Sequence, residues 1–396
     1  MKKKKGHSPL WYYVVGGIMG YSKIRGHNVK FRISDEVKNL KPPFVGIANH
    51  QGYYDWAYAA RAFFPMRFRF VVSRYQFLNP KTGKLLEKLN SIPKSQFTSD
   101  ASAVKEIIRT IKRGENVFIF PSGRLSLFGE DDKPVEGTYE LLKKLGVPVV
   151  MVHLDGSYRT APRYNTEVKK GRVVVTAYVL FTPEELKNLP EEEAKKRLYS
   201  AFCHDDFNSE NVCEFKSPDI AKGLDDLLYM CPDCKANYTV KVMPGQKLMC
   251  KDCGFSVQMD NYFKFTALSG NASPKTITEW SHIIKAEEKK RILSDPDFTL
   301  REKMDVLEHI KEDEQLTKTG ECEISLSRDG IKIEGTKKDG RFSRHYTLKE
   351  YPAMHIFDKI YLLVPDNEAV ICVSPANAKI ATRWAVVSET LSSLLL

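Results

Sequence analysis

Between Pro42 and Leu180, short apolar runs alternate with stretches whose apolar residues recur at helical spacing. The runs are rich in β-branched and aromatic residues and are bounded by turn-forming segments, which is typical of buried strands. The expected strands are FVGIA, RFRFVV, NVFIFP, VPVVMVHL and VVVTAYVLF. The expected helices are WAYAARAFF, TGKLLEKLN, SDASAVKEIIRTIKRG and EGTYELLKKLG. This alternation predicts an α/β domain with a mostly parallel sheet flanked by helices.

Capping residues set the limits of two of these helices. Ser99 or Asp100 is suited to begin the third helix, and Gly114 is suited to end it. Gly146 is suited to end the fourth, with Pro148 just beyond. A further helical segment, TPEELKNLPEEEAKKRLYSAF, follows the last strand.

The pattern changes after residue 262. Two helix-like stretches, TITEWSHIIKAEEKKRILS and TLREKMDVLEHIKE, precede five strand-like runs, which are CEISLS, GIKIEGT, RFSRHYTL, IYLLV and EAVICV. The turn signals RDG and KDG separate the first three runs. The segment ANAKIATRWAVVSETLSSLLL then predicts a closing helix. An α+β domain is therefore expected at this end of the chain.

Length and composition support several globular domains. The 396 residues exceed one ordinary domain, and 42% are hydrophobic, which excludes global disorder. We divide the chain into an interfacial anchor at 1–25, an α/β domain at 26–215, a cysteine-rich unit at 226–262 and the α+β domain at 263–396.

The net charge of +11 is concentrated at the amino-terminal end. The first forty residues hold nine basic and two acidic side chains, beginning with MKKKK. The apolar run that follows, PLWYYVVGGIMGY, is shorter than the roughly 20 residues of a membrane-spanning helix and lacks a convincing signal-peptide cleavage site. Lysines beside aromatic residues indicate a peripheral anchor on the cytoplasmic face of an anionic membrane. The alternative is a core helix behind a solvated lysine cluster.

One histidine in the α/β region has the setting of a catalytic base. Asn49 and His50 follow an apolar strand, and the carboxyl ends of such strands are where ligands bind. His50 in the loop can meet Asp55 in the first helical turn, with Gly52 giving the bend conformational freedom. A carboxylate on one ring nitrogen leaves the other free to take a proton. The alternative is a satisfied structural histidine beside a capped helix.

A second strand ends in the turn FPSGRLS. Gly123 permits close backbone approach, and Arg124 offers a planar donor fork that suits a phosphate. Ser122 lacks the flanking glycines of the G-x-S-x-G motif, so a serine hydrolase is not expected.

Together these segments resemble the glycerolipid acyltransferase family, that of the 1-acyl-glycerol-3-phosphate acyltransferases, over residues 10–200. The first block of that family is N-H-x4-D, and the third reads F-P-E-G-[TR]-x-S. Matching residues in this chain are Asn49, His50, Asp55, Phe120, Pro121, Gly123, Arg124 and Ser126. Lys94 in SIPKSQ stands where the second block has arginine, and Val147 to Val152 match the fourth block. Ser122 stands where the family has glutamate.

The resemblance implies direct acyl transfer from an acyl thioester, of coenzyme A or of acyl-carrier protein, to a lysophospholipid hydroxyl. His50 would be the base and Asp55 its orienter. The implied substrate-binding residues are Asn49, Arg74, Lys94, Ser122, Gly123 and Arg124. Because serine cannot balance the charge of Arg124, we expect a freer Arg124 and an altered acceptor preference or slow turnover. Alternatively, Ser122 only bonds the turn backbone.

Four of the eight cysteines form two close pairs. Cys231, Cys234, Cys250 and Cys253 follow C-x2-C-x15-C-x2-C, the spacing of a structural zinc ribbon. A redox pair is the alternative reading. Cys203, His204 and Cys213 match no metal-site spacing, and we expect them to be ordinary surface or packed residues.

Two other function classes remain open. One is a lipid-binding or scaffold protein on an impaired acyltransferase fold, which the residue at position 122 suggests. The other is a nucleic-acid-binding zinc-ribbon protein, but its excess charge lies in a tail rather than over a folded face. Phospholipid synthesis is therefore the favoured reading, and nucleic acid is not an expected partner.

Overall fold

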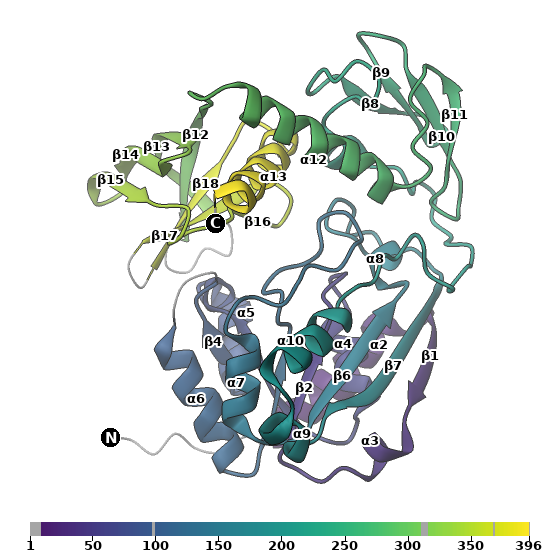
Figure 1. Ribbon diagram of the computed structural model, residues 1–396, viewed down its shortest axis with the longest axis vertical. Helices are drawn as coiled ribbons and strands as arrows, with labels where there is room; N and C mark the ends of the chain where they lie inside the picture. The colour runs from purple at the N-terminus through teal and green to yellow at the C-terminus, as the bar shows by residue number, and fades with distance from the viewer. Residues whose placement is uncertain (1–8, 97–99, 310–315, 367–368, 396) are drawn as a thin grey trace. The chain divides into compact units, whose positions relative to one another are not determined.

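The computed structural model describes residues 9–96, 100–309, 316–366 and 369–395. Its chain divides into two compact units (Figure 1). Unit 1 contains the chain up to Pro162 together with residues 166–217. Unit 2 contains residues 163–165 and the chain from Pro218 onward, so the cysteine-rich segment and the α+β segment share one unit. The lysines at 2–5 lie outside the described residues.

Unit 1 is built on a seven-stranded sheet with the order β1-β7-β6-β2-β5-β3-β4. Its strands are β1 (Asn28–Ile33), β2 (Val45–Ala48), β3 (Phe68–Ser73), β4 (Ile92–Lys94), β5 (Asn116–Ile119), β6 (Val149–Asp155) and β7 (Arg172–Phe181). Every pairing is parallel except that of β6 with β7. This confirms the mostly parallel sheet. All four residues of β2 are buried, as a strand covered on both faces requires.

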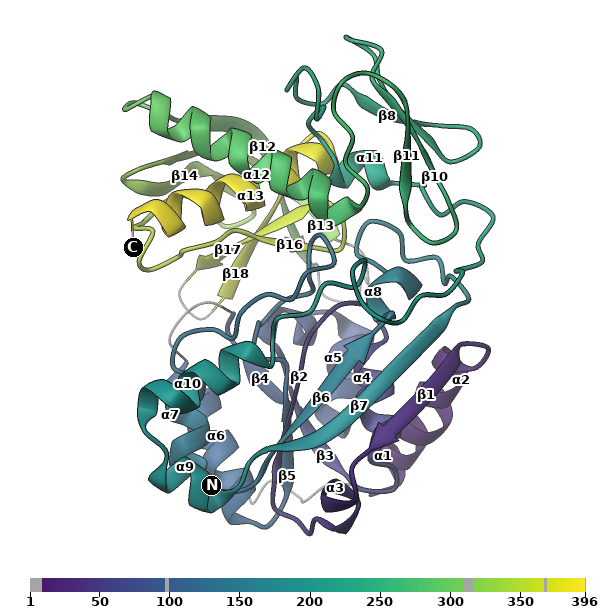
Figure 2. The same cartoon turned by 45° about the vertical axis from the view of Figure 1, so that its right-hand side comes forward.

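Helices cover both faces of this sheet (Figure 2). They are α3 (Asp35–Asn39), α4 (Asp55–Ala62), η2 (Arg74–Phe77), α5 (Pro80–Lys88), α6 (Ala101–Lys112), α7 (Thr138–Leu145), α8 (Ser157–Thr160), α9 (Pro183–Asn188) and α10 (Glu191–Ser200). Helices α6, α7, α9 and α10 pack with Val45 and Ile47 in one core. Helices α3 and α4 pack with Phe44 and Ala48 in the other. The alternation along β2 follows from the period of two in a strand.

The predicted caps of α6 and α7 are observed. The Asp100 side chain accepts a hydrogen bond from the backbone N–H of Ala103 and begins α6. Gly114 follows the end of that helix with φ 76°, and Gly146 ends α7 with φ 60°. Both glycines occupy the left-handed region that helix ends favour.

The amino-terminal apolar run is helical and packs on the rest of unit 1. It forms α1 (Pro9–Tyr12), the π-helical segment η1 (Tyr13–Met19) and α2 (Gly20–Ile24). Tyr12 and Val15 are buried, whereas Leu10, Ile18 and Tyr21 are 67%, 68% and 53% exposed. The segment therefore packs through one side and presents apolar side chains on another. Within the described part of the chain, no helix has the length and apolar character to cross a bilayer.

The cysteine-rich part of unit 2 is a four-stranded antiparallel sheet with the order β11-β10-β9-β8. It contains β8 (Val240–Met243), β9 (Lys247–Cys250), β10 (Ser256–Met259) and β11 (Phe265–Ser269), preceded by α11 (Leu224–Leu227). Helix α12 (Ile277–Ser294) packs on it through Trp280. The Trp280 ring lies 5.5 Å from Phe255 and 5.7 Å from Phe265, centroid to centroid. Its Nε1 donates to the carbonyl of Met230 at 2.9 Å.

The rest of unit 2 is a seven-stranded antiparallel sheet with the order β15-β14-β13-β12-β18-β17-β16. It contains β12 (Leu300–His309), β13 (Leu316–Ser327), β14 (Gly330–Lys337), β15 (Gly340–Tyr346), β16 (His355–Phe357), β17 (Tyr361–Asp366) and β18 (Ala369–Ser374). The terminal helix α13 (Ala378–Leu395) follows, as predicted. Buried Glu288 of α12 accepts from Arg383 of α13 at 2.8 Å, which ties the two helices together.

The predicted helix at TLREKMDVLEHIKE is wrong, because Leu300–His309 is strand β12. This strand lies between β13 and β18 and pairs with both. Its buried positions alternate, with Met304 and Val306 inward and Lys303 outward. Charged Glu302 interrupts the alternation of apolar residues in the sequence. In the structure its side chain is half-buried, and this burial raises its pKa. Tertiary pairing therefore overrides the helical propensity of this segment.

Candidate active site

The His50–Asp55 pair lies where β2 ends and α4 begins. His50 Nδ1 and Asp55 Oδ2 are 2.9 Å apart. The His50 side chain is 23% exposed and that of Asp55 is fully buried. A ring nitrogen that faces a carboxylate carries the proton, which leaves Nε2 as the basic nitrogen. The arrangement is therefore that of an oriented, solvent-accessible base.

Asp55 is fixed by its other contacts. Its Oδ2 also accepts from the backbone N–H groups of Gln51 at 2.6 Å and Gly52 at 2.9 Å. Its Oδ1 accepts from the hydroxyl of Ser157, the first residue of α8. Several donors on one buried carboxylate prevent its rotation. Asp55 can thus hold His50 in one orientation.

The reason for glycine at position 52 differs from the one expected. A Cβ there would lie 2.6 Å from the carbonyl oxygen of Ser157 and 3.1 Å from that of Ala161. Gly52 does not have a positive φ. Close approach of the α8 backbone, rather than conformational freedom, therefore requires glycine here.

Two further contacts hold His50. Its ring stacks on Phe120 with centroids 4.1 Å apart and planes 23° apart. Its carbonyl accepts from the backbone N–H of Ser126 at 2.7 Å. Both partners come from the segment after β5, so that segment positions His50 as well as Arg124.

The Asn49 side chain joins two strands of the sheet. Its Nδ2 donates to the carbonyl of Leu154 at 2.9 Å, and its Oδ1 accepts from the N–H of Leu154 at 2.8 Å. It also donates to Asp131 Oδ1 at 3.0 Å. Asn49 is 1% exposed. The geometry gives it a structural task, which is to fix the end of β2 against β6.

The expectation of a freer Arg124 side chain is wrong, because Asp132 binds it. Arg124 Nε and Nη2 donate to the two carboxylate oxygens of Asp132 at 2.9 and 2.8 Å. Ser122 Oγ donates to the carbonyl of Arg124 at 3.0 Å, which is the turn-forming role weighed as the alternative. Gly123 has φ 70°, a conformation that favours glycine. The sequence missed Asp132 because it stands outside the family block that supplied the motif.

The second basic candidate, Lys94, ends strand β4 beside β3. Burial lowers its pKa, while Asp100 raises it. Its neighbour Gln96 accepts from Ser73 at 2.8 Å and donates to the carbonyl of Gly123 at 2.5 Å. Gln96, two residues after Lys94, thereby connects the end of β4 to the Arg124 turn.

Arg74 has structural partners. It donates to Asp100 Oδ2 and to Ser95 Oγ, both at 3.2 Å. Asp100 is also the cap of α6. Arg74 therefore stabilises the start of that helix, and its role in substrate binding stays a prediction.

A buried network lies behind His50, and the sequence did not indicate it. Asp131 Oδ1 accepts from the amides of Asn49 and Gln51. Burial raises the pKa of Asp131 to about 7, although His204 and the two amides lower it. His204 in turn bonds Asp206 at 3.2 Å. The only signal for Asp131 in the sequence was its place shortly after the third block.

Asp155, His204 and Asp206 lie close enough to share a cation, with ligand atoms within 4.8 Å of one another. Arg159 already donates to Asp206 Oδ2 at 3.2 Å and lies 3.4 Å from Asp155. Since a guanidinium balances these carboxylates, the cluster is best described as a structural ion-pair network.

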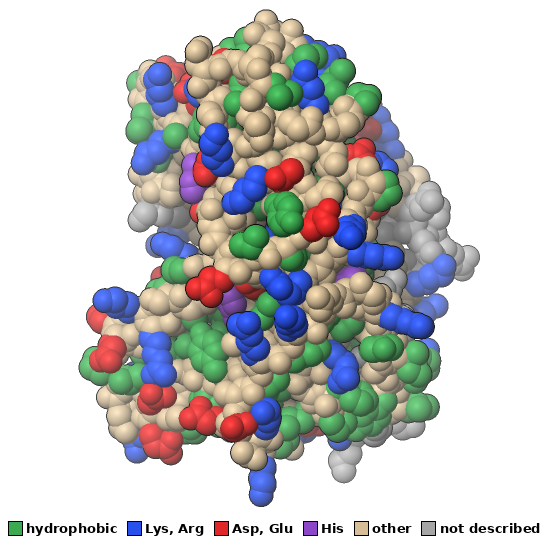
Figure 3. All heavy atoms as spheres, turned by 90° about the vertical axis from the view of Figure 1, so that its right-hand side faces the viewer, with side chains coloured by type: hydrophobic (Ala, Val, Ile, Leu, Met, Phe, Trp, Pro, Cys, Tyr) green, Lys and Arg blue, Asp and Glu red, His purple; other side chains and the backbone are tan. Residues whose placement is uncertain are grey.

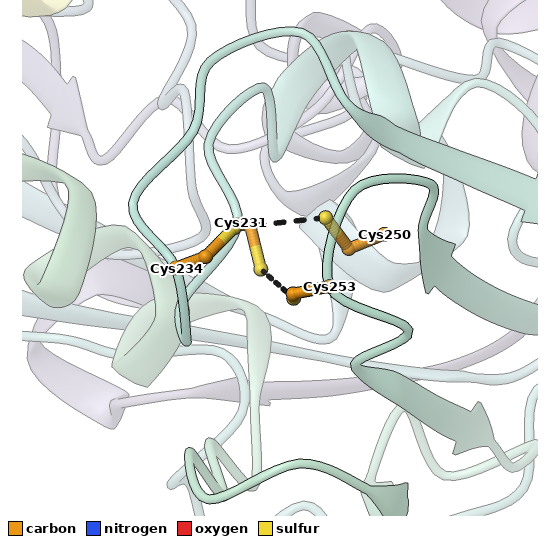
Figure 4. A group of neighbouring side chains, drawn as sticks. All are labelled: Cys231, Cys234, Cys250 and Cys253. Carbon is orange, nitrogen blue, oxygen red and sulfur yellow. Dashed lines mark hydrogen bonds between the residues drawn. The ribbon is translucent and has the colours of Figure 1, made fainter.

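The four predicted zinc ligands lie together in unit 2 (Figure 4). The Sγ atoms of Cys231 and Cys253 are 3.6 Å apart, and those of Cys234 and Cys250 are 3.8 Å apart. Zn–S bonds of about 2.3 Å in a tetrahedron place sulfurs about 3.8 Å apart, whereas a disulfide requires about 2.05 Å. The spacing fits a metal and does not fit a disulfide.

The comparisons with known proteins concern unit 1. Residues 28–154 match the family model Acyltransferase. This part of the chain carries an Acyltransferase domain. The acyltransferase domain is 25% identical over 152 residues to a 1-acyl-sn-glycerol-3-phosphate acyltransferase of Bacillus subtilis, covering 38% of this chain and 72% of that protein.

A chloroplastic 1-acyl-sn-glycerol-3-phosphate acyltransferase of Brassica napus is 27% identical over 122 residues, or 30% of this chain. The match spans 35% of that protein's length, so the chain covers about a third of this relative. Among solved structures, the 1-acyl-sn-glycerophosphate acyltransferase of Thermotoga maritima aligns with a TM-score of 0.41 and 21% identity, covering 51% of this chain and 80% of that one. Within the acyltransferase domain, His50, Asp55 and Arg124 all fall in the matched range.

Proposed function

We propose that the protein transfers a fatty acyl group from an acyl thioester to the hydroxyl of a lysophospholipid, with 1-acyl-glycerol-3-phosphate as the acceptor. The observation that carries the proposal is the His50–Asp55 contact of 2.9 Å, in which a buried carboxylate orients an exposed imidazole. The names of the relatives support the acceptor, and the matched residues 28–154 support the reaction class.

The proposed chemistry needs no nucleophilic side chain. His50 Nε2 takes the proton of the acceptor hydroxyl as its oxygen attacks the thioester carbonyl. The C–S bond of the resulting tetrahedral intermediate then breaks, and the thiolate leaves with the proton from His50. The donor is acyl-coenzyme A or acyl-carrier protein. Asp55 stabilises the transient imidazolium through its contact with His50 Nδ1.

Arg124 and Lys94 are the proposed partners of the acceptor phosphate. A guanidinium after β5 and an ammonium at the end of β4, with β3 between these two strands, suit a dianionic headgroup. The segments that carry them meet through the hydrogen bond from Gln96 to the Gly123 carbonyl. A headgroup held there would have its hydroxyl at the same sheet edge as His50.

A panel assay tests the function. Purified protein is incubated with lysophosphatidic acid, lysophosphatidylcholine, lysophosphatidylethanolamine and glycerol 3-phosphate, each with acyl-coenzyme A and with acyl-carrier protein, and products are identified by mass. We expect a diacyl product from lysophosphatidic acid and free thiol in equal amount. A protein that binds these lipids yet forms no product with any pair would instead be the lipid-binding scaffold.

We also propose one structural zinc ion, held by Cys231, Cys234, Cys250 and Cys253. The 3.6 and 3.8 Å sulfur separations support it. Lys235 and Gly254, each directly after a cysteine pair, have φ 62° and 76°, so the two turns have similar backbones. The ion would fix the two turns to one another and would have no part in acyl transfer.

A membrane site for the protein is a further proposal. The apolar side chains on α1, η1 and α2 that face away from the domain would enter the interface, next to the basic tail. Nucleic acid is the less favoured partner, because acidic side chains lie among the basic ones on the face drawn in Figure 3.

Vesicle co-sedimentation checks the membrane proposal. Each lysine near an anionic surface contributes about 1 kcal/mol, so replacing Lys2 to Lys5 by glutamine should weaken binding strongly. High salt should have the same effect, and removal of the first twenty or so residues should reduce binding further. The matched control replaces four exposed lysines elsewhere in unit 1, namely Lys112, Lys144, Lys187 and Lys196. Equal loss in both variants, or unchanged binding after truncation, would count against the anchor.

A further inference from the structure

One short loop contacts both functional segments of the acyltransferase domain. It runs from Ser126 to Asp132, after the Arg124 turn. Its first residue donates its N–H to the carbonyl of His50 at 2.7 Å. Its last two residues are consecutive carboxylates, Asp131 and Asp132, and they have different partners.

Asp131 binds the residues on either side of the base. Its Oδ1 accepts from Asn49 Nδ2 at 3.0 Å and from Gln51 Nε2. Gln51 also donates its N–H to Asp55 at 2.6 Å. Because both neighbours of His50 are tied to one oxygen, the backbone that carries the imidazole is fixed.

Asp132 binds the guanidinium of Arg124 through both carboxylate oxygens, at 2.9 and 2.8 Å. The two side chains are 28% and 17% exposed, so water screens this pair less than a surface pair. A bidentate contact fixes the plane of the guanidinium as well as its position. The carboxylate that the third block lacks at Ser122 is thus supplied from eight residues beyond Arg124.

The loop itself has little freedom. Ser126 Oγ donates to the carbonyl of Glu130 at 2.6 Å and accepts from the N–H of Gly129 at 2.9 Å. Asp131 N–H donates to the carbonyl of His204 at 2.8 Å. A loop closed on itself and bound to the segment at 204–206 can hold both carboxylates at a constant separation.

We propose that Asp131 and Asp132 are paired positioning residues, which set the distance and orientation between the His50 base and the Arg124 fork. The inference rests on the proposed function, since it assigns the base to His50 and the acceptor phosphate to Arg124. Neither carboxylate touches the reacting atoms. Asp131 acts through the His50 segment and affects the chemical step, whereas Asp132 acts through Arg124 and affects acceptor binding.

The roles proposed for Asp131 and Asp132 predict opposite kinetic effects of their substitution. Asp131→Ala should lower kcat by about tenfold or more and leave the acceptor KM within about twofold, because the base is displaced while Arg124 is not. Asp132→Asn should raise the acceptor KM about tenfold and leave kcat within about threefold, because one acceptor of the fork becomes a donor facing a donor. A merely structural role would lower the folded fraction and with it the apparent kcat, without changing KM, so kcat is expressed per folded protein, as measured by thermal unfolding of each variant.

Conservative variants sharpen the test. Asp131 Oδ2 is shielded from solvent and has no hydrogen-bond partner among the described residues. Asp131→Asn keeps the shared Oδ1 and should therefore retain near-normal kcat. Ser122→Glu places a carboxylate in the Arg124 turn, so we expect it to restore part of the acceptor affinity lost in Asp132→Asn.

The control is Glu185→Gln in α9. Glu185 accepts from Arg197 at 2.7 Å and from the N–H of Thr182 at 2.9 Å, so this variant also loses a carboxylate–arginine pair. It should lower the melting temperature and change neither kcat nor KM. The proposal is overturned if Asp131→Ala and Asp132→Asn show the same proportional changes in kcat and KM, or if Asp132→Asn leaves the acceptor KM unchanged.

Wild type and His50→Ala are assayed in the same series, which separates this proposal from the proposed function. Turnover by wild type and none by His50→Ala upholds the proposed function. The separate effects on kcat and KM then test the positioning roles of Asp131 and Asp132. If wild type forms no product, the function fails on its own. Calorimetric binding of lysophosphatidic acid then tests the role of Asp132, and amide hydrogen exchange at residues 49–55 tests the role of Asp131. Unchanged affinity in Asp132→Asn, or unchanged exchange in Asp131→Ala, overturns it.

Discussion

His50→Ala is expected to abolish measurable acyl transfer while the protein stays folded. A positioned general base contributes roughly 100- to 10,000-fold to rate, and among the described side chains of the site His50 is the imidazole that is both oriented and accessible. Its removal leaves buried Asp55 with the N–H donors of Gln51 and Gly52 and the hydroxyl of Ser157. The carboxylate therefore remains satisfied, so stability should fall little.

The measurement is product formation from lysophosphatidic acid, together with thermal unfolding of each variant. His345→Ala, which removes an exposed imidazole of β15, is the control and should keep full activity. Asp55→Asn should lose most of the activity, because an amide cannot hold the ring in the same way. Near-normal turnover in His50→Ala would show that the catalytic assignment is wrong.

Removal of zinc is expected to unfold the cysteine-rich sheet of unit 2. Structural zinc contributes on the order of 10 kcal/mol in small peptides, and the strands β8 to β11 form a small sheet of their own. The loss should extend to α12, since Trp280 packs on Phe255 and Phe265 and bonds the Met230 carbonyl. The acyltransferase domain has its own two cores and should remain folded.

Metal analysis of protein purified without chelator should give one zinc per chain. After chelation, hydrogen exchange should rise at residues 230–294 and stay unchanged in α6 and α7. Cys234→Ser should reproduce the effect, whereas Cys203→Ser, which changes another exposed cysteine, should not. A preparation that contains no zinc and resists chelation would contradict the assignment.

Sequence reasoning located the features that depend on short stretches of chain. The His50–Asp55 contact spans five residues, and the helix caps at Asp100 and Gly146 are local. Each cysteine pair also lies within one turn of the chain. Such features can be predicted from the sequence because the spacing of a few residues fixes their geometry.

The sequence-based predictions were wrong where contacts between distant segments determine the local structure. The segment Leu300–His309 has helix-forming residues, yet pairing with β13 and β18 makes it a strand. Gly52 is required by the carbonyl of Ser157, a residue more than one hundred positions away in the chain. Propensity and turn chemistry contain no information about such neighbours.

The sequence by itself predicted the acyltransferase domain that residues 28–154 match, the contact of His50 with Asp55, and the four cysteines that come together in unit 2. Only the tertiary structure showed that Asp132 holds Arg124, that Asp131 holds both neighbours of His50, and that Ser157 binds Asp55. The physical reason lies in the sheet. The parallel strands β2, β5 and β6 bring their carboxyl ends to one edge, so loops far apart in sequence exchange hydrogen bonds there.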